Sequence, residues 1–301
     1  MNRPGYLLLL FTPVLAFVSS CTLIDPSVQV PTYLHIGKVN VTTNYSLQGT
    51  DSSKITDAWV YINNQYVGAF QLPATIPVLT SGTTTVSVDG GIEVSGISAN
   101  RSQYPFFTQF TQTLNLVKGQ KTTLNPTVTY LSQTVFPWTC SDGPGEDFES
   151  VSASIVKNPN SYTDTVIQII RTPALVYQGK GSGGIFLDNK HLVYEGISSK
   201  AYKISVNPDT SSYLELNYKS TSPFVVGLYP GQEQTALGLG IPPLPALTIN
   251  PSVSWNKIYV SLNAAVASYP ASVYTVYFFM AKDSATAQPA LYLDNIKLVT
   301  F

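Results

Sequence analysis

Apolar and polar residues alternate in short segments along most of the chain, and this pattern predicts β-strands rather than helices. In the first half, such segments lie at 33–43, 55–62, 66–70, 75–79, 84–88, 91–97, 106–116 and 121–129. Asn63 and Asn64 separate two of them, and Asn tolerates the left-handed conformation of a tight hairpin turn. This number of strands in roughly 100 residues is typical of a sandwich. We therefore expect an N-terminal β-sandwich over residues 32–132.

The second half repeats the pattern after a Pro- and Gly-rich stretch at 133–144, whose turn composition predicts a linker. Strand-like segments follow at 166–170, 183–188, 200–205, 212–218, 223–229, 255–262, 272–280 and 290–300. Eight antiparallel strands suit two sheets packed face to face, as in a jelly-roll. The prediction is an all-β protein of two β-sandwich domains: an Ig-like, carrier-type sandwich followed by a jelly-roll at 145–301.

Composition supports strands joined by turns and excludes one class of partner. Charged residues make up only 11% of the chain, against roughly 25% in typical domains, while Gly and Pro number 20 and 21. The formal net charge is -1, which provides no basic surface for a phosphate backbone. We expect no nucleic-acid partner.

The N-terminus has the pattern of a secretion signal: Arg3, then the apolar stretch of residues 6–18, interrupted by Pro13. This stretch is shorter than the roughly 20 apolar residues of a transmembrane helix. It ends in Val18-Ser19-Ser20-Cys21, which resembles the lipobox of bacterial lipoproteins. The resemblance implies cleavage of residues 1–20, acylation of Cys21 and residence in the cell envelope, at the outer membrane. Pro26, Pro31 and the scattered apolar residues that follow Cys21 predict a tether over 21–31. An ordinary secretory signal is the alternative.

Few residues are placed for catalysis. With Cys21 acylated, Cys140 has no intramolecular partner, so we expect a free thiol and no disulfide. The two histidines, His35 and His191, fall in different predicted domains. Glu195 and Glu215 are the one carboxylate pair worth weighing as a glycosidase pair, and two scattered glutamates are weak grounds for it. We expect no enzyme activity.

The first half resembles a known kind of domain. The segments at 56–63, 72–79, 96–99 and 104–106 are similar to a recurring domain of uncharacterised Gram-negative surface lipoproteins, which is similar to carboxypeptidase regulatory-like and PEGA sandwiches. The resemblance implies a spacer or a protein-binding platform.

The second half resembles jelly-roll carbohydrate-binding modules in the segments 147–149, 213–219, 255–260 and 291–298. Such modules often hold a structural calcium where the first and last strands meet. The resemblance implies Glu146, Asp147, Glu149 and Asp294 as its ligands, completed by carbonyls and water to the roughly six to eight oxygens that calcium takes. The alternative is that Asp147 and Asp294 cap strand ends.

Alternation assigns side chains to the two faces of the middle strands. Tyr213 and Glu215 share one face of their strand, and Trp255 and Tyr259 share one face of theirs, because successive side chains point oppositely. If the two faces coincide, these four residues form a platform on which a sugar stacks, with polar groups fixing its orientation. The alternative is that the aromatic rings pack in the core.

Two functions remain open. The first is a non-catalytic, membrane-anchored lipoprotein whose jelly-roll binds glycan, with the N-terminal sandwich as spacer. The second is a structural or assembly protein of the envelope that binds another protein.

Overall fold

The computed structural model describes residues 29–140, 143–205, 211–231, 241–283, 286 and 288–301. The predicted signal peptide, Cys21 and all but the last residues of the predicted tether lie outside the described residues. The described chain is almost entirely β, which confirms the predicted fold class. No helix in these ranges is long and apolar enough to cross a membrane.

The N-terminal domain is built from ten strands and one short helix. Their bounds are β1 (Thr32–Ile36), β2 (Asn40–Val41), α1 (Tyr45–Gln48), β3 (Asp57–Ile62), β4 (Gln65–Gln71), β5 (Ala74–Val78), β6 (Gly82–Glu93), β7 (Arg101–Gln103), β8 (Phe110–Leu116), β9 (Lys121–Leu124) and β10 (Thr127–Val128). One sheet has the order β4-β3-β6-β7, with β8 also paired to β6, and it faces the sheet β5-β1-β9. The predicted hairpin is confirmed: Asn63 and Asn64 connect β3 and β4 with φ of 49° and 64°.

The C-terminal domain begins after a small hairpin of β11 (Thr139–Cys140) and β12 (Gly143–Pro144). Its elements are β13 (Ile155–Lys157), β14 (Gln168–Ile170), η2 (Pro173–Leu175), β15 (Ser182–Phe186), β16 (Val193–Ser198), β17 (Tyr213–Ser220), β18 (Phe224–Pro230), β19 (Leu244–Ile249), β20 (Ser252–Ser261), α3 (Asn263–Ser268), β21 (Tyr274–Ala281) and β22 (Ala290–Val299). They form two five-stranded sheets, β13-β16-β21-β18-β19 and β14-β15-β22-β17-β20. The predicted jelly-roll is therefore confirmed.

Each domain has its own hydrophobic core. In the C-terminal domain, residues such as Leu214 and Leu298 of one sheet and Val226 and Phe278 of the other are fully buried between the sheets. Burying one such side chain contributes roughly 1.5–3 kcal/mol, so this core accounts for the stability of the domain without a disulfide. Cys140 is a free thiol, as predicted.

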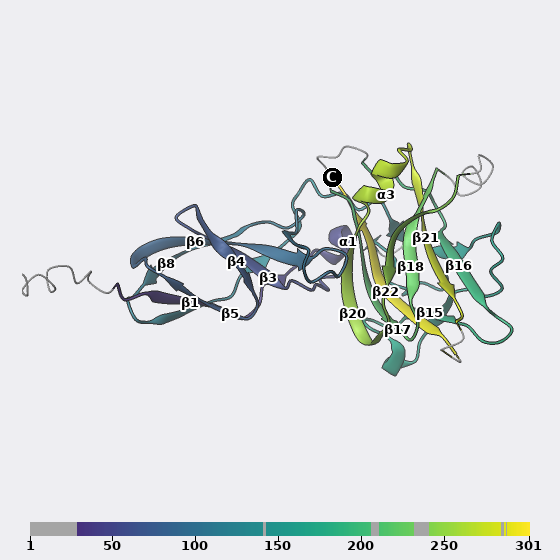
Figure 1. The fold of residues 1–301 in the computed structure, drawn as a ribbon, viewed down its shortest axis with the longest axis horizontal. Coiled ribbons are helices and arrows are strands. Elements are labelled where there is room, and N and C mark those ends of the chain that lie inside the picture. The colour runs from purple at the N-terminus through teal and green to yellow at the C-terminus, as the bar shows by residue number, and fades with distance from the viewer. Residues whose placement is uncertain (1–28, 141–142, 206–210, 232–240, 284–285, 287) are drawn as a thin grey trace, which may run out of the picture.

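The two domains lie end to end along the long axis of the molecule (Figure 1). The boundary between the domains is closely packed. Tyr213, Tyr259 and Val299 of the C-terminal domain belong to the same buried cluster as the N-terminal core. Val94 forms a β-bridge with Tyr259, and the Ser95 N–H donates to the Tyr259 carbonyl at 2.8 Å. The interface is thus a packed, hydrogen-bonded surface.

Some of the strand predictions are wrong. The segments 84–88 and 91–97 were predicted as two strands, but residues 82–93 form one long strand, β6. The segment 200–205 contributes only an isolated bridge at Tyr202. In the C-terminal domain, strands β13, β16 and β19 were not predicted from the sequence.

Candidate functional site

One sheet face of the jelly-roll collects most of the residues singled out from the sequence. In β17, Leu214 and Leu216 point into the core, so Tyr213 and Glu215 point to the outer face of the sheet β14-β15-β22-β17-β20, as alternation predicts. Yet the side chains on both faces of this part of β17 are buried. The N-terminal domain covers this part of the outer face.

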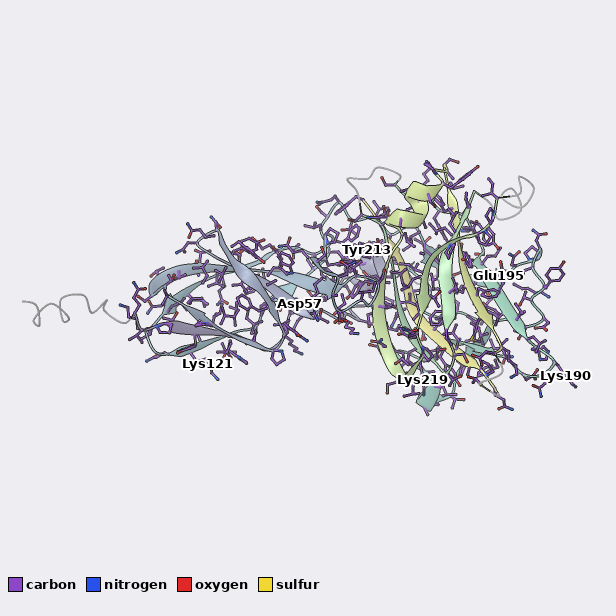
Figure 2. The ribbon with its side chains drawn as sticks, viewed as in Figure 1. Asp57, Lys121, Lys190, Glu195, Tyr213 and Lys219 are labelled. Carbon is purple, nitrogen blue, oxygen red and sulfur yellow. The ribbon has the colours of Figure 1, made fainter. Side chains whose placement is uncertain are left out.

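Three of the four predicted platform residues therefore lie in the domain interface. Tyr213, Glu215 and Tyr259 are 6%, 0% and 2% exposed. The Tyr104 ring contacts the rings of Tyr213 and Tyr259, with centroids 5.4 and 4.9 Å apart. The structure thus corrects the prediction of one open platform: these residues share a face, but the other domain fills it. Figure 2 shows Tyr213 beside the N-terminal domain.

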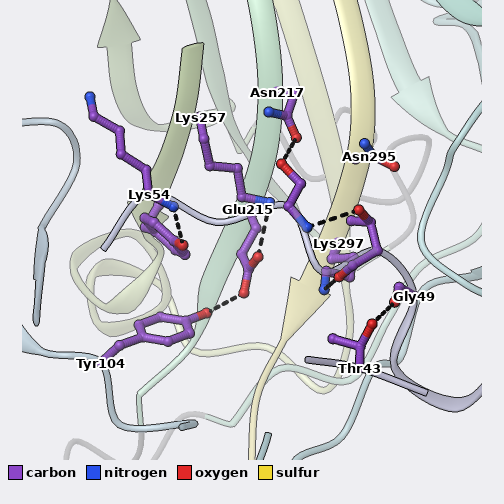
Figure 3. Close-up of polar contacts among 12 residues, drawn as sticks. Thr43, Gly49, Lys54, Tyr104, Glu215, Asn217, Lys257, Asn295 and Lys297 are labelled. Atoms are coloured by element: carbon purple, nitrogen blue, oxygen red, sulfur yellow. Dashed lines mark hydrogen bonds and ion pairs between the residues drawn. The ribbon is translucent and has the colours of Figure 1, made fainter. Parts of the chain in front are cut away.

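Glu215 is the centre of a buried polar network between the domains (Figure 3). Its Oε1 accepts hydrogen bonds of 2.7 Å from both Tyr104 and Tyr130, and its Oε2 lies 3.0 Å from Lys257 Nζ. Lys297 Nζ donates to the Tyr130 hydroxyl at 2.8 Å. Two lysines and two tyrosines thus surround a single carboxylate.

Lys297 connects the last strand to the end of α1 and the segment that follows it. Its ammonium donates to the carbonyls of Gln48 and Thr50 at 3.1 and 2.9 Å. Glu215 and Lys297 are at most 1% exposed. A buried charge without partners costs several kcal/mol. Because the N-terminal domain supplies hydrogen-bond partners to both Glu215 and Lys297, the network is complete only when the two domains are docked.

The charges shift one another's ionisation. Burial raises the pKa of Glu215, but the ammonium groups of Lys257 and Lys297 and the two tyrosine hydrogen bonds hold it below its usual value overall. Burial lowers the pKa of Lys297 to about 7, and the Glu215 charge opposes this shift. Burial also raises the pKa values of Tyr104 and Tyr130, so their hydroxyls stay protonated and donate to Glu215.

The same outer face continues beyond the interface into an exposed region. Trp255 lies two residues before Lys257 on β20, Tyr292 two residues before Asp294 on β22, and Lys219 pairs with Tyr292 across the ladder. Trp255, Tyr292 and Lys219 are all partly exposed. Figure 2 shows Lys219 at the lower end of the jelly-roll.

Four aromatic rings run across this region. Trp255 contacts Tyr177 and Tyr292 at centroid distances of 5.4 and 6.5 Å, and Tyr292 contacts Phe186 at 5.7 Å. Lys219 Nζ lies 5.8 Å from the centre of the Tyr292 ring. We call Tyr177, Phe186, Trp255, Tyr292 and Lys219 the aromatic strip.

The N-terminal domain helps to position the strip. Ser52 Oγ lies 3.0 Å from the Tyr177 hydroxyl and donates to Asn217 Oδ1 at 2.9 Å. Thr50 donates to Gln178 Oε1 at 2.7 Å. The loop that carries Tyr177 is therefore held by residues of the other domain.

Sequence reasoning identified Trp255 but not its neighbours. Alternation along β22 places Tyr292 on the face of Asp294, which was a usable signal. Tyr177 follows η2 in a loop, and no periodicity predicts where a loop side chain lies.

The four carboxylates implied as calcium ligands each bind protein donors. Glu146 accepts from the Phe148 N–H and from Ser154, Asp147 from the Tyr45 hydroxyl, Glu149 from the N–H groups of Lys180 and Gly181, and Asp294 from Ser182. Within the described ranges, no three His, Cys, Asp or Glu side chains gather so that they can hold a metal ion. These residues do not fit a shared calcium shell in this arrangement, and calcium binding stays an untested prediction.

The sequence has no match among family models, nor among curated proteins. Solved structures similar to part of the chain include a family 29 carbohydrate-binding module, which is 11% identical with a TM-score of 0.32 and covers 56% of this chain and 89% of that one. A family 30 module of a cellulosomal cellulase of Clostridium thermocellum is 15% identical with a TM-score of 0.34, covering 55% of this chain and 96% of that one. Likeness at this level carries no argument about a ligand, which has to be inferred from the side chains of this chain.

Proposed function

We propose that the protein is a non-catalytic binding protein of the cell envelope that binds glycan through the aromatic strip. The observation that carries this proposal is the strip itself: three rings on one sheet face, joined by the ring of Tyr177 from the adjoining loop, with Lys219 beside them. Flat rings accept the apolar faces of sugar rings, while a few polar groups orient them. The ligand class is therefore a hydroxyl-rich, largely uncharged chain.

The positions of the glutamates support a non-catalytic role. Glycoside hydrolysis uses a carboxylate pair on either side of the scissile bond. Glu215 is buried in the domain interface, and Glu195 lies on β16 in the opposite sheet, where Asn158 and Tyr229 donate to it. The strip contains no carboxylate.

The test is glycan binding by the full chain. A glycan array identifies a ligand, and calorimetry then compares Trp255→Ala and Tyr292→Ala with the parent. We expect each substitution to weaken binding at least about tenfold, which corresponds to ~1.4 kcal/mol. Tyr162→Ala is the matched control, because Tyr162 is 98% exposed and lies outside the strip.

An array without binding, together with capture of one specific envelope protein, would favour the alternative of a structural or assembly protein. Unchanged affinity in both strip variants would also contradict the proposal.

We further propose that Cys21 is acylated and anchors the protein in the outer membrane, a proposal that rests on residues 1–21 alone. Several acyl chains anchor durably, because each buried CH₂ contributes about 0.8 kcal/mol. Cys21→Ser is expected to abolish labelling by an alkyne fatty acid and to release the protein from the membrane fraction. Labelling that persists in this variant would contradict the anchor.

A further inference from the structure

A second group of aromatic residues, one exposed and two partly exposed, lies on the N-terminal domain, on the outer face of the sheet β4-β3-β6-β7. Val60 of β3 and Val88 of β6 point into the core of that domain. Alternation therefore places Trp59 and Tyr61 of β3, and Asp89 of β6, on the outer face. The residues that dock the C-terminal domain, such as Tyr104 and Tyr130, are different ones.

Three rings form the centre of this surface. Trp59 and Tyr66 stack with centroids 5.7 Å apart at 29°, and Tyr61 lies 5.4 Å from Tyr66. Tyr66 is 54% exposed, although a ring of this size usually gains by burial. Tyr66 thus faces solvent, and Trp59 and Tyr61 are partly exposed beside it.

A glycine leaves room for the indole of Trp59 to pack against the sheet. A Cβ at Gly91 would lie 2.8 Å from Trp59 Nε1 and 2.9 Å from the Asp57 Cβ. Any other residue at 91 would push the Trp59 ring away from the sheet. The pyrrole edge of Trp59 therefore packs against Gly91, and its Nε1 is buried.

A row of polar groups borders the rings. Asp89 Oδ2 accepts hydrogen bonds of 3.1 Å from both Gln103 and Gln109, and Gln103 also donates to the Tyr61 hydroxyl at 2.8 Å. Both amides donate to the same oxygen, Oδ2. Neither of these two side chains donates to Asp89 Oδ1. The two amides fix the carboxylate and leave its other oxygen for an outside donor.

We propose that this surface, Trp59, Tyr61, Tyr66, Asp89, Gln103 and Gln109, is a second glycan-binding site that acts independently of the aromatic strip. The occupant is a neutral polysaccharide chain. Its ring faces stack on Trp59 and Tyr66, one hydroxyl donates to Asp89, and neighbouring hydroxyls bond the amides. Two amides and one free carboxylate oxygen beside the rings match the hydroxyls and apolar faces of a neutral sugar chain.

The three tryptophans allow each site to be followed alone. Trp59 belongs to the N-terminal surface, Trp255 to the strip, and Trp138 is fully buried in the C-terminal core. In Trp255→Phe, a change of fluorescence on adding polysaccharide reports the N-terminal surface over a constant Trp138 background. In Trp59→Phe, it reports the strip. Failure of one site is thus distinguished from failure of the other.

The probes are soluble glucan, mannan and xylan, titrated into the full chain carrying Trp255→Phe. We expect at least one to quench Trp59, and Tyr66→Ala in that background to weaken the apparent affinity at least about tenfold, as loss of a stacking ring should. Asp89→Asn should weaken it less, because it removes a charge but keeps an acceptor. Tyr33→Ala is the matched control, since Tyr33 is 37% exposed on the other sheet of the same domain and should change nothing.

Two results would overturn the proposal. One is that none of the three polysaccharides changes the fluorescence of Trp255→Phe. The other is that Tyr66→Ala binds as tightly as its parent, with circular dichroism showing both folded. If both sites bind, the parent should bind a long polysaccharide more tightly than Tyr66→Ala or Tyr292→Ala, each of which weakens one site. The reason is that binding at the second site is then intramolecular.

Discussion

Glu215 Oε2 and Lys257 Nζ lie 3.0 Å apart on adjacent strands of the jelly-roll, and the N-terminal domain shields both from water. Tyr104 and Tyr130 complete this environment from the other domain. The ion pair itself lies within the C-terminal domain, but its burial and its tyrosine partners depend on docking of the N-terminal domain.

Removing the carboxylate charge should destabilise the protein strongly. Glu215→Gln leaves Lys257 and Lys297 buried without an anion, and breaking a buried pair in this way costs about 3–5 kcal/mol. Urea unfolding followed by fluorescence measures the change. Asp188→Asn is the control and should leave the midpoint nearly unchanged, because the Asp188–His191 pair is exposed. A Glu215→Gln midpoint equal to that of the parent would refute the role of the network.

Lys297 predicts a pH dependence of stability. Its pKa is about 7 in the folded protein, against an ordinary value of 10.5. Between these values the unfolded chain binds a proton that the folded chain does not, so this group's contribution to the free energy of unfolding rises with pH. Below pH 7 both states are protonated, and the full cost of burying the charge, a few kcal/mol at most, is present.

The measurement is the unfolding free energy at pH 7 and at pH 9.5. The parent should gain stability over this interval relative to Lys297→Met, because methionine has no titrating group at this position. Parallel pH profiles for the two proteins would show that Lys297 keeps an ordinary pKa.

Cys140 should react slowly in the folded protein. Burial raises the pKa of its thiol to about 11, and Glu146 lies beside the sulfur. At pH 8 the reactive thiolate is then about a hundredfold rarer than at the ordinary pKa of 9.0. Alkylation by iodoacetamide, followed by mass spectrometry with and without urea, tests this. Equal rates in both conditions would contradict the environment described for the thiol.

Calcium should have little effect on the melting temperature. Glu146, Asp147, Glu149 and Asp294 are each engaged by protein donors, so an ion would have to displace them. Scanning calorimetry in millimolar calcium and in excess chelator measures the difference. A rise of several degrees in calcium would restore the shared site that the sequence resemblance implied.

Alternation predicted the faces of β17 correctly, and the reasons for its failures are specific. The predicted break between 84–88 and 91–97 is wrong, because Gly90 and Gly91 lie inside β6. Glycine stands there because a Cβ would approach Ile55 or Trp59 closely. Strand β19 contains Pro245, which argues against a strand unless the strand is at an edge, and β19 is an edge strand.

The site was less predictable than the strands. That Tyr213, Glu215 and Tyr259 share a face follows from periodicity. That a second domain covers the face depends on contacts between residues far apart in the sequence, such as Tyr130 and Glu215, which are 85 positions apart. The aromatic strip could not be predicted for the same reason. Tyr177 lies in a loop, and only the folding of that loop brings its ring to Trp255.

The covered face of β17, β20 and β22 also determines what can be transplanted. A jelly-roll cut out at residue 145 would expose Tyr213, Glu215, Lys257 and Tyr259 to water, and Tyr177 would lose its contact with Ser52. Grafted onto another protein, this domain would expose to water a surface that is buried in the full chain. The two domains should therefore be produced and tested as a single unit.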